Sequence, residues 1–217
     1  IGIIDGKGRQ VPGDLLTAFL AKDVAARHPG APILLDVKSS EAALRLVESA
    51  GAAAQIWKTG HSHMKKRMKE LEAPLAGEMS GHIFIADNYL GFDDAIYAAV
   101  RVITQMVKGG QSITEFMDSL PEQHATPELR IDCPDTVKFD SMEKIRAHVL
   151  SGHDAADVNS IDGVRVRSGD GWWLIRASNT EAALVARAEA ADRTALDRLL
   201  GDIETTLAAA GLDWKRP

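Results

Sequence analysis

The chain has 217 residues, of which 45% are hydrophobic and 26% are charged, which is typical of one large or two small soluble globular domains. A net charge of −6 argues against a general nucleic-acid-binding protein, and no apolar run approaches the roughly 18 residues that a membrane helix needs. The single cysteine, Cys133, cannot form an internal disulfide, so we expect an inert buried thiol and a cytoplasmic protein with no membrane or nucleic-acid partner.

The first 110 residues alternate between strand and helix patterns, which predicts a mainly parallel α/β domain built in three layers. Strands are expected at residues 33–35, 53–57, 74–76 and 83–85, and helices at 12–28, 39–51, 63–71 and 93–109. In the last helix, the apolar positions recur every three to four residues, the pattern of a helix that buries one apolar face. These positions are Ile96, Val100, Ile103 and Val107.

Residues 119–128 contain two prolines and few apolar residues, which predicts a linker and divides the chain into domains at 1–120 and 121–217. After it, strands are expected at 129–133, 158–161, 164–167, 172–176 and 184–190. Helices are expected over 194–210 and from Asp140, which pairs with Glu143 as a capping box. Hairpin strands with helices at the ends predict a smaller α+β domain. Trp172 and Trp173 point to opposite faces of their strand, so we expect one in the core and one at an edge.

Residues 77–82 read Gly-Glu-Met-Ser-Gly-His and lie between two apolar runs, which predicts a polar loop between two strands. Glu78 accepts hydrogen bonds when ionised, whereas Ser80 and His82 can donate or accept them. The set suits a ligand with several hydroxyls, although an ordinary polar turn explains the spacing equally well.

A second polar stretch, Arg176-Ala177-Ser178-Asn179-Thr180, follows another apolar run. It brings a guanidinium, two hydroxyls and an amide into five residues. Arginine matches phosphate oxygens with two parallel N–H bonds, and the neutral groups add further donors. Together the two loops favour a ligand that carries both hydroxyls and phosphate, which is a sugar phosphate.

Other polar residues follow the expected strands, where ligands of α/β sheets gather. Lys38 is a candidate for substrate contact or catalysis, with an ordinary surface lysine as the alternative. Asp36 either orients Lys38 or caps the next helix, and capping is favoured. His61 and His63 have no cysteine nearby, so a zinc site is disfavoured and no metal ligand is assigned. The acid-free stretch 52–68 carries basic residues that would attract an anion or form a solvated helix face.

The two loops resemble the sugar-binding and phosphate-binding loops of the phosphohexomutases, and of their bacterial phosphomannomutase/phosphoglucomutase branch in particular. Asp36-Val37-Lys38 and residues 57–62 agree with the same family. The resemblance covers essentially the whole chain, but only the last two of the family's four domains. It implies an intramolecular phosphotransferase that interconverts hexose 1-phosphate and hexose 6-phosphate of mannose or glucose. It also implies a TATA-binding-protein-like fold for the second domain.

The resemblance also assigns roles to residues. It implies catalytic groups at Lys38, His61 and His82, and substrate contacts at Glu78, Ser80, Arg176, Ser178, Asn179 and Thr180. The intact enzyme would use Mg²⁺ and a glucose or mannose 1,6-bisphosphate activator. In the family the phosphate loop continues after its threonine with one residue and then proline, whereas Glu181 and Ala182 follow here, which puts the rigidity of the loop in doubt.

Two features of the family have no counterpart in the chain: the reactive serine that carries a phosphoryl group, and the triple-aspartate metal loop. No Asp-x-Asp-x-Asp occurs, and the sequence does not begin with Met. We therefore expect the C-terminal half of a mutase, inactive alone and partnered by the N-terminal domains of the same enzyme. The alternatives are phosphoglucosamine mutase, whose sugar loop tends to have Gln at the position of Met79, and a non-catalytic sugar-phosphate-binding module.

Overall fold

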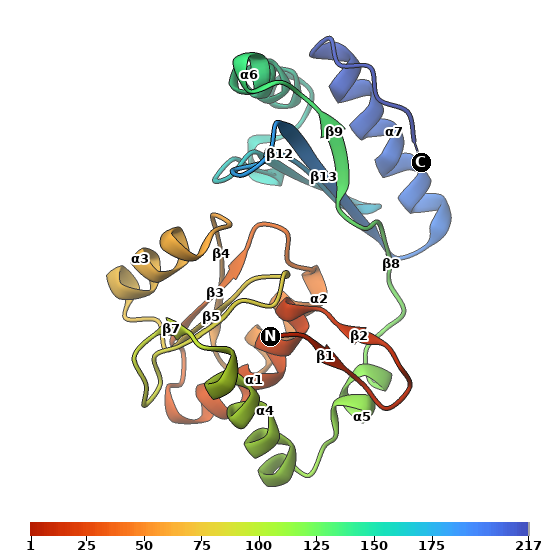
Figure 1. Cartoon of the computed structure of the whole chain (residues 1–217). Helices are drawn as coiled ribbons and strands as arrows, with labels where there is room; N and C mark the ends of the chain where they lie inside the picture. The colour runs from red at the N-terminus through yellow and green to blue at the C-terminus, as the bar shows by residue number, and fades with distance from the viewer. Residues whose placement is uncertain (217) are drawn as a thin grey trace. The chain divides into compact units, whose positions relative to one another are not determined.

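The computed structural model describes residues 1–216 and divides into two compact units, Ile1–Pro121 and Glu122–Pro217 (Figure 1). The boundary expected from the sequence, between residues 120 and 121, differs from this division by one residue. Each unit has its own apolar core. None of the helices within residues 1–216 is both long enough and apolar enough to cross a bilayer.

The first unit is built on a five-stranded sheet in the order β4-β3-β5-β6-β7. Its strands are β3 (Pro32–Asp36), β4 (Ala53–Trp57), β5 (Leu75–Gly77), β6 (Ile83–Ile85) and β7 (Phe92–Asp93). β3 runs parallel to β4 and β5, whereas β6 and β7 continue the sheet antiparallel. The parallel prediction therefore holds for three strands only, because a tight turn joins β5 to β6 and can only make an antiparallel pair.

Helices cover both faces of this sheet, which confirms the three-layer prediction. They are α1 (Gly13–Arg27), α2 (Glu41–Ser49), α3 (His61–Leu71), α4 (Ala95–Gly109) and α5 (Ile113–Asp118). Side chains of β3 alternate between the layers: Ile33 and Leu35 pack in the core with α1, α2, α4 and α5, whereas Leu34 packs with α3. A short antiparallel ribbon, β1 (Ile3–Ile4) and β2 (Gln10–Val11), precedes α1.

Two expectations for the helices of this unit are wrong. α3 begins at His61 and not at residue 63, so both histidines lie in its first turn. The expected apolar face of α4 does not point inward: Ile96, Val100, Ile103 and Val107 are all exposed, and the helix turns Ala98 and Val102 to the core.

The second unit is an antiparallel sheet with helices α6 (Asp135–Gly152) and α7 (Arg193–Ala209) on one face. Its strands are β8 (His124–Ala125), β9 (Leu129–Asp132), β10 (Val158–Asn159), β11 (Val164–Ser168), β12 (Gly171–Ala177) and β13 (Ala183–Ala190), with a short 3₁₀ helix, η1 (Ala155–Asp157), before β10. The order is β10-β11-β12-β13-β8, and β9 also pairs with β13. This two-layer α+β arrangement agrees with the fold that the family resemblance implies.

Three details of the second unit differ from the expectations. α6 begins directly after Pro134, which puts Asp140 and Glu143 inside the helix instead of at its cap. Part of the expected linker is strand β8, which pairs with β13. Trp172 is not at an edge: it is as buried as Trp173 on the other face, where the Arg165 guanidinium stacks 3.8 Å from the centre of its ring.

Candidate functional site

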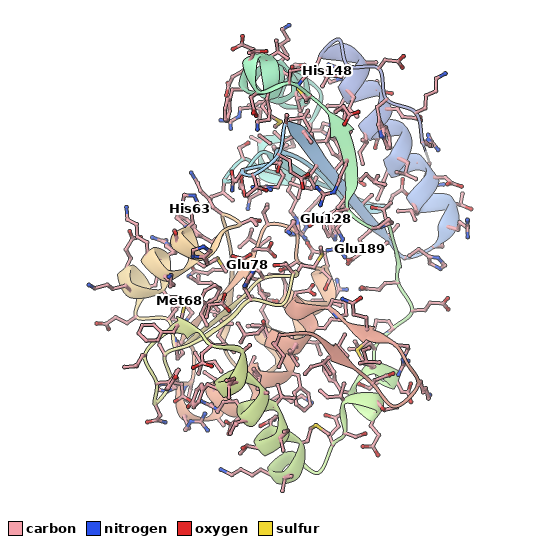
Figure 2. The ribbon with its side chains drawn as sticks, viewed as in Figure 1. His63, Met68, Glu78, Glu128, His148 and Glu189 are labelled. Carbon is pink, nitrogen blue, oxygen red and sulfur yellow. The ribbon has the colours of Figure 1, made fainter. Side chains whose placement is uncertain are left out.

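Residues 78–82 form the turn between β5 and β6, and Figure 2 labels Glu78 in it. The Glu78 N–H donates to the carbonyl of His82 across the turn (2.9 Å). The first residue of α1 also binds the turn: the Gly13 N–H donates to the carbonyl of Met79 (3.0 Å). The prediction of a polar loop between two strands is confirmed, and backbone hydrogen bonds hold this loop in one conformation.

Asp36 joins the three loops that follow β3, β4 and β5. Its fully buried carboxylate accepts hydrogen bonds from the hydroxyls of Ser39 (2.8 Å) and Thr59 (3.0 Å) and from the Met79 N–H (3.1 Å). The favoured interpretation of Asp36 as a helix cap is wrong, because Ser40 caps α2. Since parallel strands end at one edge, a single carboxylate can organise all three polar loops there.

Glu78 is the second buried carboxylate at this edge. Its Oε1 accepts from the backbone N–H of Gly60 (3.0 Å), and its Oε2 accepts from the hydroxyl of Ser80 (3.4 Å). Gly60 has φ +120°, a conformation that only glycine adopts without strain, and its N–H thereby reaches Glu78. The buried ammonium of Lys38 lies 3.9 Å from Asp36 Oδ2, so a cation and two carboxylates share the edge.

The electrostatics of this edge favour protonation of its carboxyl groups. Burial raises the pKa of Glu78, and the charge of Asp36 raises it further, whereas Gly60, His82 and Lys38 act in the opposite direction. Burial also raises the pKa of Asp36, against the opposing effects of Lys38 and its hydrogen-bond donors. Perturbed carboxyls of this kind are typical of functional sites.

We expect Glu78→Gln to raise the free energy of unfolding at neutral pH. A carboxyl whose pKa is raised in the folded protein destabilises the fold progressively as pH rises from the unfolded pKa, about 4.3, through the folded pKa. The variant's gain in the free energy of unfolding over the parent should therefore be largest at pH 7. It should shrink toward about pH 4.5, where the pKa of the unfolded state is approached. Urea unfolding at both pH values measures it, with the exposed Glu48→Gln as control. A gain that does not depend on pH would contradict the assignment.

The two predicted catalytic histidines are placed differently. His82 Nδ1 lies 2.7 Å from Oδ2 of Asp93, the last residue of β7, and the His82 side chain is about half exposed. His61 is exposed and follows Gly60, whose N–H binds Glu78. The structure thus brings Lys38, Glu78 and Ser80 together at the edge, puts His61 beside them in the chain, and engages His82 with Asp93.

In the second unit, the predicted phosphate loop connects β12 to β13. The Ser178 hydroxyl accepts from the N–H groups of Thr180 (3.3 Å) and Glu181 (3.2 Å), so it shapes the turn from inside. Lys138, a buried residue of α6, donates from Nζ to the carbonyls of Ser178 (3.0 Å) and Glu181 (2.9 Å). Lys138 thereby braces the loop, while Asn179 and Thr180 remain exposed at its tip.

Arg176 lies near the end of β12 with its side chain buried. Its Nε donates to Asp162 Oδ2 (3.0 Å), while its buried Nη2 has no hydrogen-bond partner within residues 1–216. Gly163, next to Asp162, packs so tightly here that a Cβ would overlap the carbonyl of Ile175. A buried guanidinium N–H without an acceptor is unfavourable, and an anion would satisfy it.

Sequence reasoning missed Asp36 as an organiser, Lys138 and Asp162. Asp162 lies between the strands expected at 158–161 and 164–167, and an acidic residue in such a turn is a candidate partner for an arginine on a nearby strand. Lys138 contacts a loop 40 residues away, and no local pattern reports such a contact.

The carboxylates of the site do not form a metal centre. Within residues 1–216, no three His, Cys, Asp or Glu side chains converge so that they could hold a metal ion. Asp36 and Glu78 accept hydrogen bonds from N–H and O–H donors instead. The Mg²⁺ of the resemblance therefore does not fit these side chains, since Mg²⁺ requires oxygen ligands in near-octahedral geometry.

Comparison with known families defines the class of protein. The phosphoglucomutase/phosphomannomutase α/β/α domain III matches residues 12–124, and the phosphoglucomutase/phosphomannomutase C-terminal domain matches residues 128–206. The two matched domains follow one another along the chain as the two units do. The chain belongs to the phosphoglucomutase/phosphomannomutase family.

Individual relatives support this family membership. The phosphomannomutase/phosphoglucomutase of Pseudomonas putida is 42% identical over 207 residues, covering 95% of this chain and 44% of the relative. The phosphoglucomutase of Neisseria gonorrhoeae is 36% identical over 199 residues, covering 92% of this chain and 43% of the relative. The crystal structure of a phosphoglucomutase/phosphomannomutase family protein from Burkholderia thailandensis matches with a TM-score of 0.87 at 36% identity. The match covers 98% of this chain and 45% of that protein. The chain thus spans less than half the length of these relatives.

Proposed function

We propose that the chain is the sugar-phosphate-binding half of a phosphohexomutase that interconverts the 1-phosphate and 6-phosphate of mannose or glucose. The observation that carries the proposal is the buried Arg176 guanidinium with an unpartnered Nη2 beside a braced loop of donors. The names of the relatives support the mannose and glucose sugars over glucosamine. The buried thiol of Cys133 fits a cytoplasmic enzyme, which is part of the proposal.

In this proposal the two polar loops recognise different parts of the substrate. Arg176 and the donors of Ser178, Asn179 and Thr180 bind the phosphate that does not react. Glu78 and Ser80 bind ring hydroxyls, since a carboxylate and a hydroxyl offer acceptors and a donor at one edge. These two residues are already oriented by their contacts in the turn.

Lys38, His61 and His82 lie nearer the transferred phosphoryl group in the proposal. The ammonium of Lys38 compensates the negative charge of a phosphoryl group, and its position beside Asp36 keeps it oriented. The imidazoles of His61 and His82 can hold or move a proton at a sugar hydroxyl. Asp93 orients His82 through Nδ1, so Nε2 of the same ring is the atom that can exchange a proton with the sugar hydroxyl.

The complete reaction needs groups that we propose lie in the N-terminal domains of the same enzyme. A phosphoserine there gives its phosphoryl group to the free hydroxyl of the hexose phosphate, forming a 1,6-bisphosphate, and the other phosphate then returns to the serine. The N-terminal domains would also hold Mg²⁺, which would supply charge neutralisation for the transfer. Added glucose or mannose 1,6-bisphosphate acts as activator because it phosphorylates the serine.

The 217-residue chain alone should therefore show no mutase activity, whereas the full-length protein should be active. Both are assayed with mannose 1-phosphate, glucose 1-phosphate and glucosamine 1-phosphate, each with a trace of the matching 1,6-bisphosphate. Turnover by the isolated chain within the ordinary enzymatic range, about 1–1,000 s⁻¹, would contradict the proposal. A full-length protein that prefers glucosamine 1-phosphate would instead support phosphoglucosamine mutase, and one that turns over none of the three would support a binding module.

A further inference from the structure

The exposed large apolar side chains of the first unit gather in a few segments. Four lie on α4: Ile96 (81% exposed), Val100 (53%), Ile103 (61%) and Val107 (78%). The others within residues 1–121 are Ile4 of β1 (72%) and, just before α4, Leu90 (68%) and Phe92 (55%). We call the surface formed by the four α4 residues the α4 face.

The composition of the α4 face differs from that of a helix side that faces water. A solvated helix side normally carries charged residues, but between Ala95 and Val107 the only charged residue of α4 is Arg101. Arg101 is directed away from this surface, because its guanidinium pairs with Asp87 (2.8 Å) and Asp23 (3.2 Å). Contiguous exposed apolar surface of this kind marks an interaction site in soluble proteins.

The beginning of the chain runs along the same helix. A groove of about 430 Å³ is lined on one side by residues 1–6 and on the other by residues of α4 and α5, among them Ile103, Met106 and Ile113. The backbone nitrogen of Ile1 lies 2.7 Å from the carbonyl oxygen of Gly81, so this segment starts beside the turn at residues 78–82. Polypeptide joined to Ile1 would therefore enter beside the α4 face.

We propose that the α4 face is the docking surface for the domain that precedes domain III in the full-length polypeptide. The matched relatives are more than twice as long as this chain, and the match begins at their domain III. The segment at Ile1 connects a preceding domain of the same polypeptide covalently to the region of the α4 face, whereas a second copy of the chain has no such connection. The proposal depends on membership of the family and not on the identity of the sugar phosphate.

Thiol labelling in two forms of the protein tests the proposal. Val100→Cys is placed in the 217-residue chain and in the full-length protein, and Leu150→Cys on the exposed side of α6 is the matched control. Both thiols should react rapidly in the 217-residue chain, where Cys133 is buried. In the full-length protein, labelling at position 100 should slow at least about tenfold, because a docked residue reacts only when the interface opens, while labelling at position 150 should not change.

Ile103→Glu provides a second readout. It should leave the thermal midpoint of the 217-residue chain nearly unchanged, because the side chain is already in water, and should lower that of the full-length protein. Equal labelling rates at position 100 in the two forms would overturn the proposal. So would a gene that encodes no upstream domain, or protection of position 100 in the 217-residue chain that grows with protein concentration, which would identify a second copy as the occupant.

Discussion

Arg176→Ala in the full-length protein should weaken the binding of hexose phosphate by about 10- to 150-fold. Hydrogen bonds to charged groups contribute about 1.5–3 kcal/mol, and each 1.4 kcal/mol changes affinity about tenfold. Arg176→Lys should recover only part of the loss, because an ammonium cannot reproduce two parallel donors and cannot keep the geometry of the contact with Asp162. Substrate titration calorimetry and KM measure the effect.

The matched control for this prediction is Arg193→Ala. Arg193 is an exposed arginine of the same unit and follows the opposite end of β13 from the phosphate loop. Its removal should leave affinity unchanged, and circular dichroism should show that all three variants are folded. If Arg176→Ala and Arg176→Lys both leave KM and kcat within about twofold of the parent, Arg176 does not bind the phosphate.

Lys138→Met should lower the free energy of unfolding of the 217-residue chain by about 1–3 kcal/mol. Methionine keeps the apolar stem, but the carbonyls of Ser178 and Glu181 lose their donor, and a buried unpaired polar group costs about that much. In the full-length protein the same change should raise KM for the hexose phosphate, because the donors of the loop are no longer held in place. Urea unfolding monitored by tryptophan fluorescence and steady-state kinetics are the two measurements.

Lys144→Met is the control for the bracing lysine, since Lys144 is an exposed residue of the same helix. It should change stability by no more than about 0.5 kcal/mol, which is usual for a surface substitution. A Lys138→Met protein that loses stability without a change in KM would show that the lysine supports the fold alone. A protein that keeps both stability and KM would show that the loop needs no brace.

Local patterns were sufficient for much of the fold. A continuous apolar run located β3, and the alternation of strands with helices placed three polar loops at one sheet edge. Two of those loops meet at Asp36 through Thr59 and Met79, as expected when parallel strands end together. The polar loop at residues 78–82 could be located because apolar strands flank it on both sides.

The details that could not be predicted depend on long-range contacts. The helical period of α4 shows that one side is apolar, but not that this side remains uncovered within residues 1–216. Arg165, on the neighbouring strand, stacks over the ring of the buried Trp172, and alternation along one strand cannot report such a contact. The acid-x-x-Glu pattern at Asp140 is typical of a capping box, yet Pro134 starts the helix earlier.

The most direct test of the account is a ligand titration of the 217-residue chain followed by NMR at assigned backbone amides. Mannose 6-phosphate should cause saturable shifts at residues 78–82 and at residues 176–181, whereas inorganic phosphate should shift only the second set. Mannose alone should not shift the second set. If mannose 6-phosphate shifts neither loop, or shifts residues 176–181 no more tightly than inorganic phosphate and leaves residues 78–82 unchanged, the two loops do not recognise a sugar phosphate.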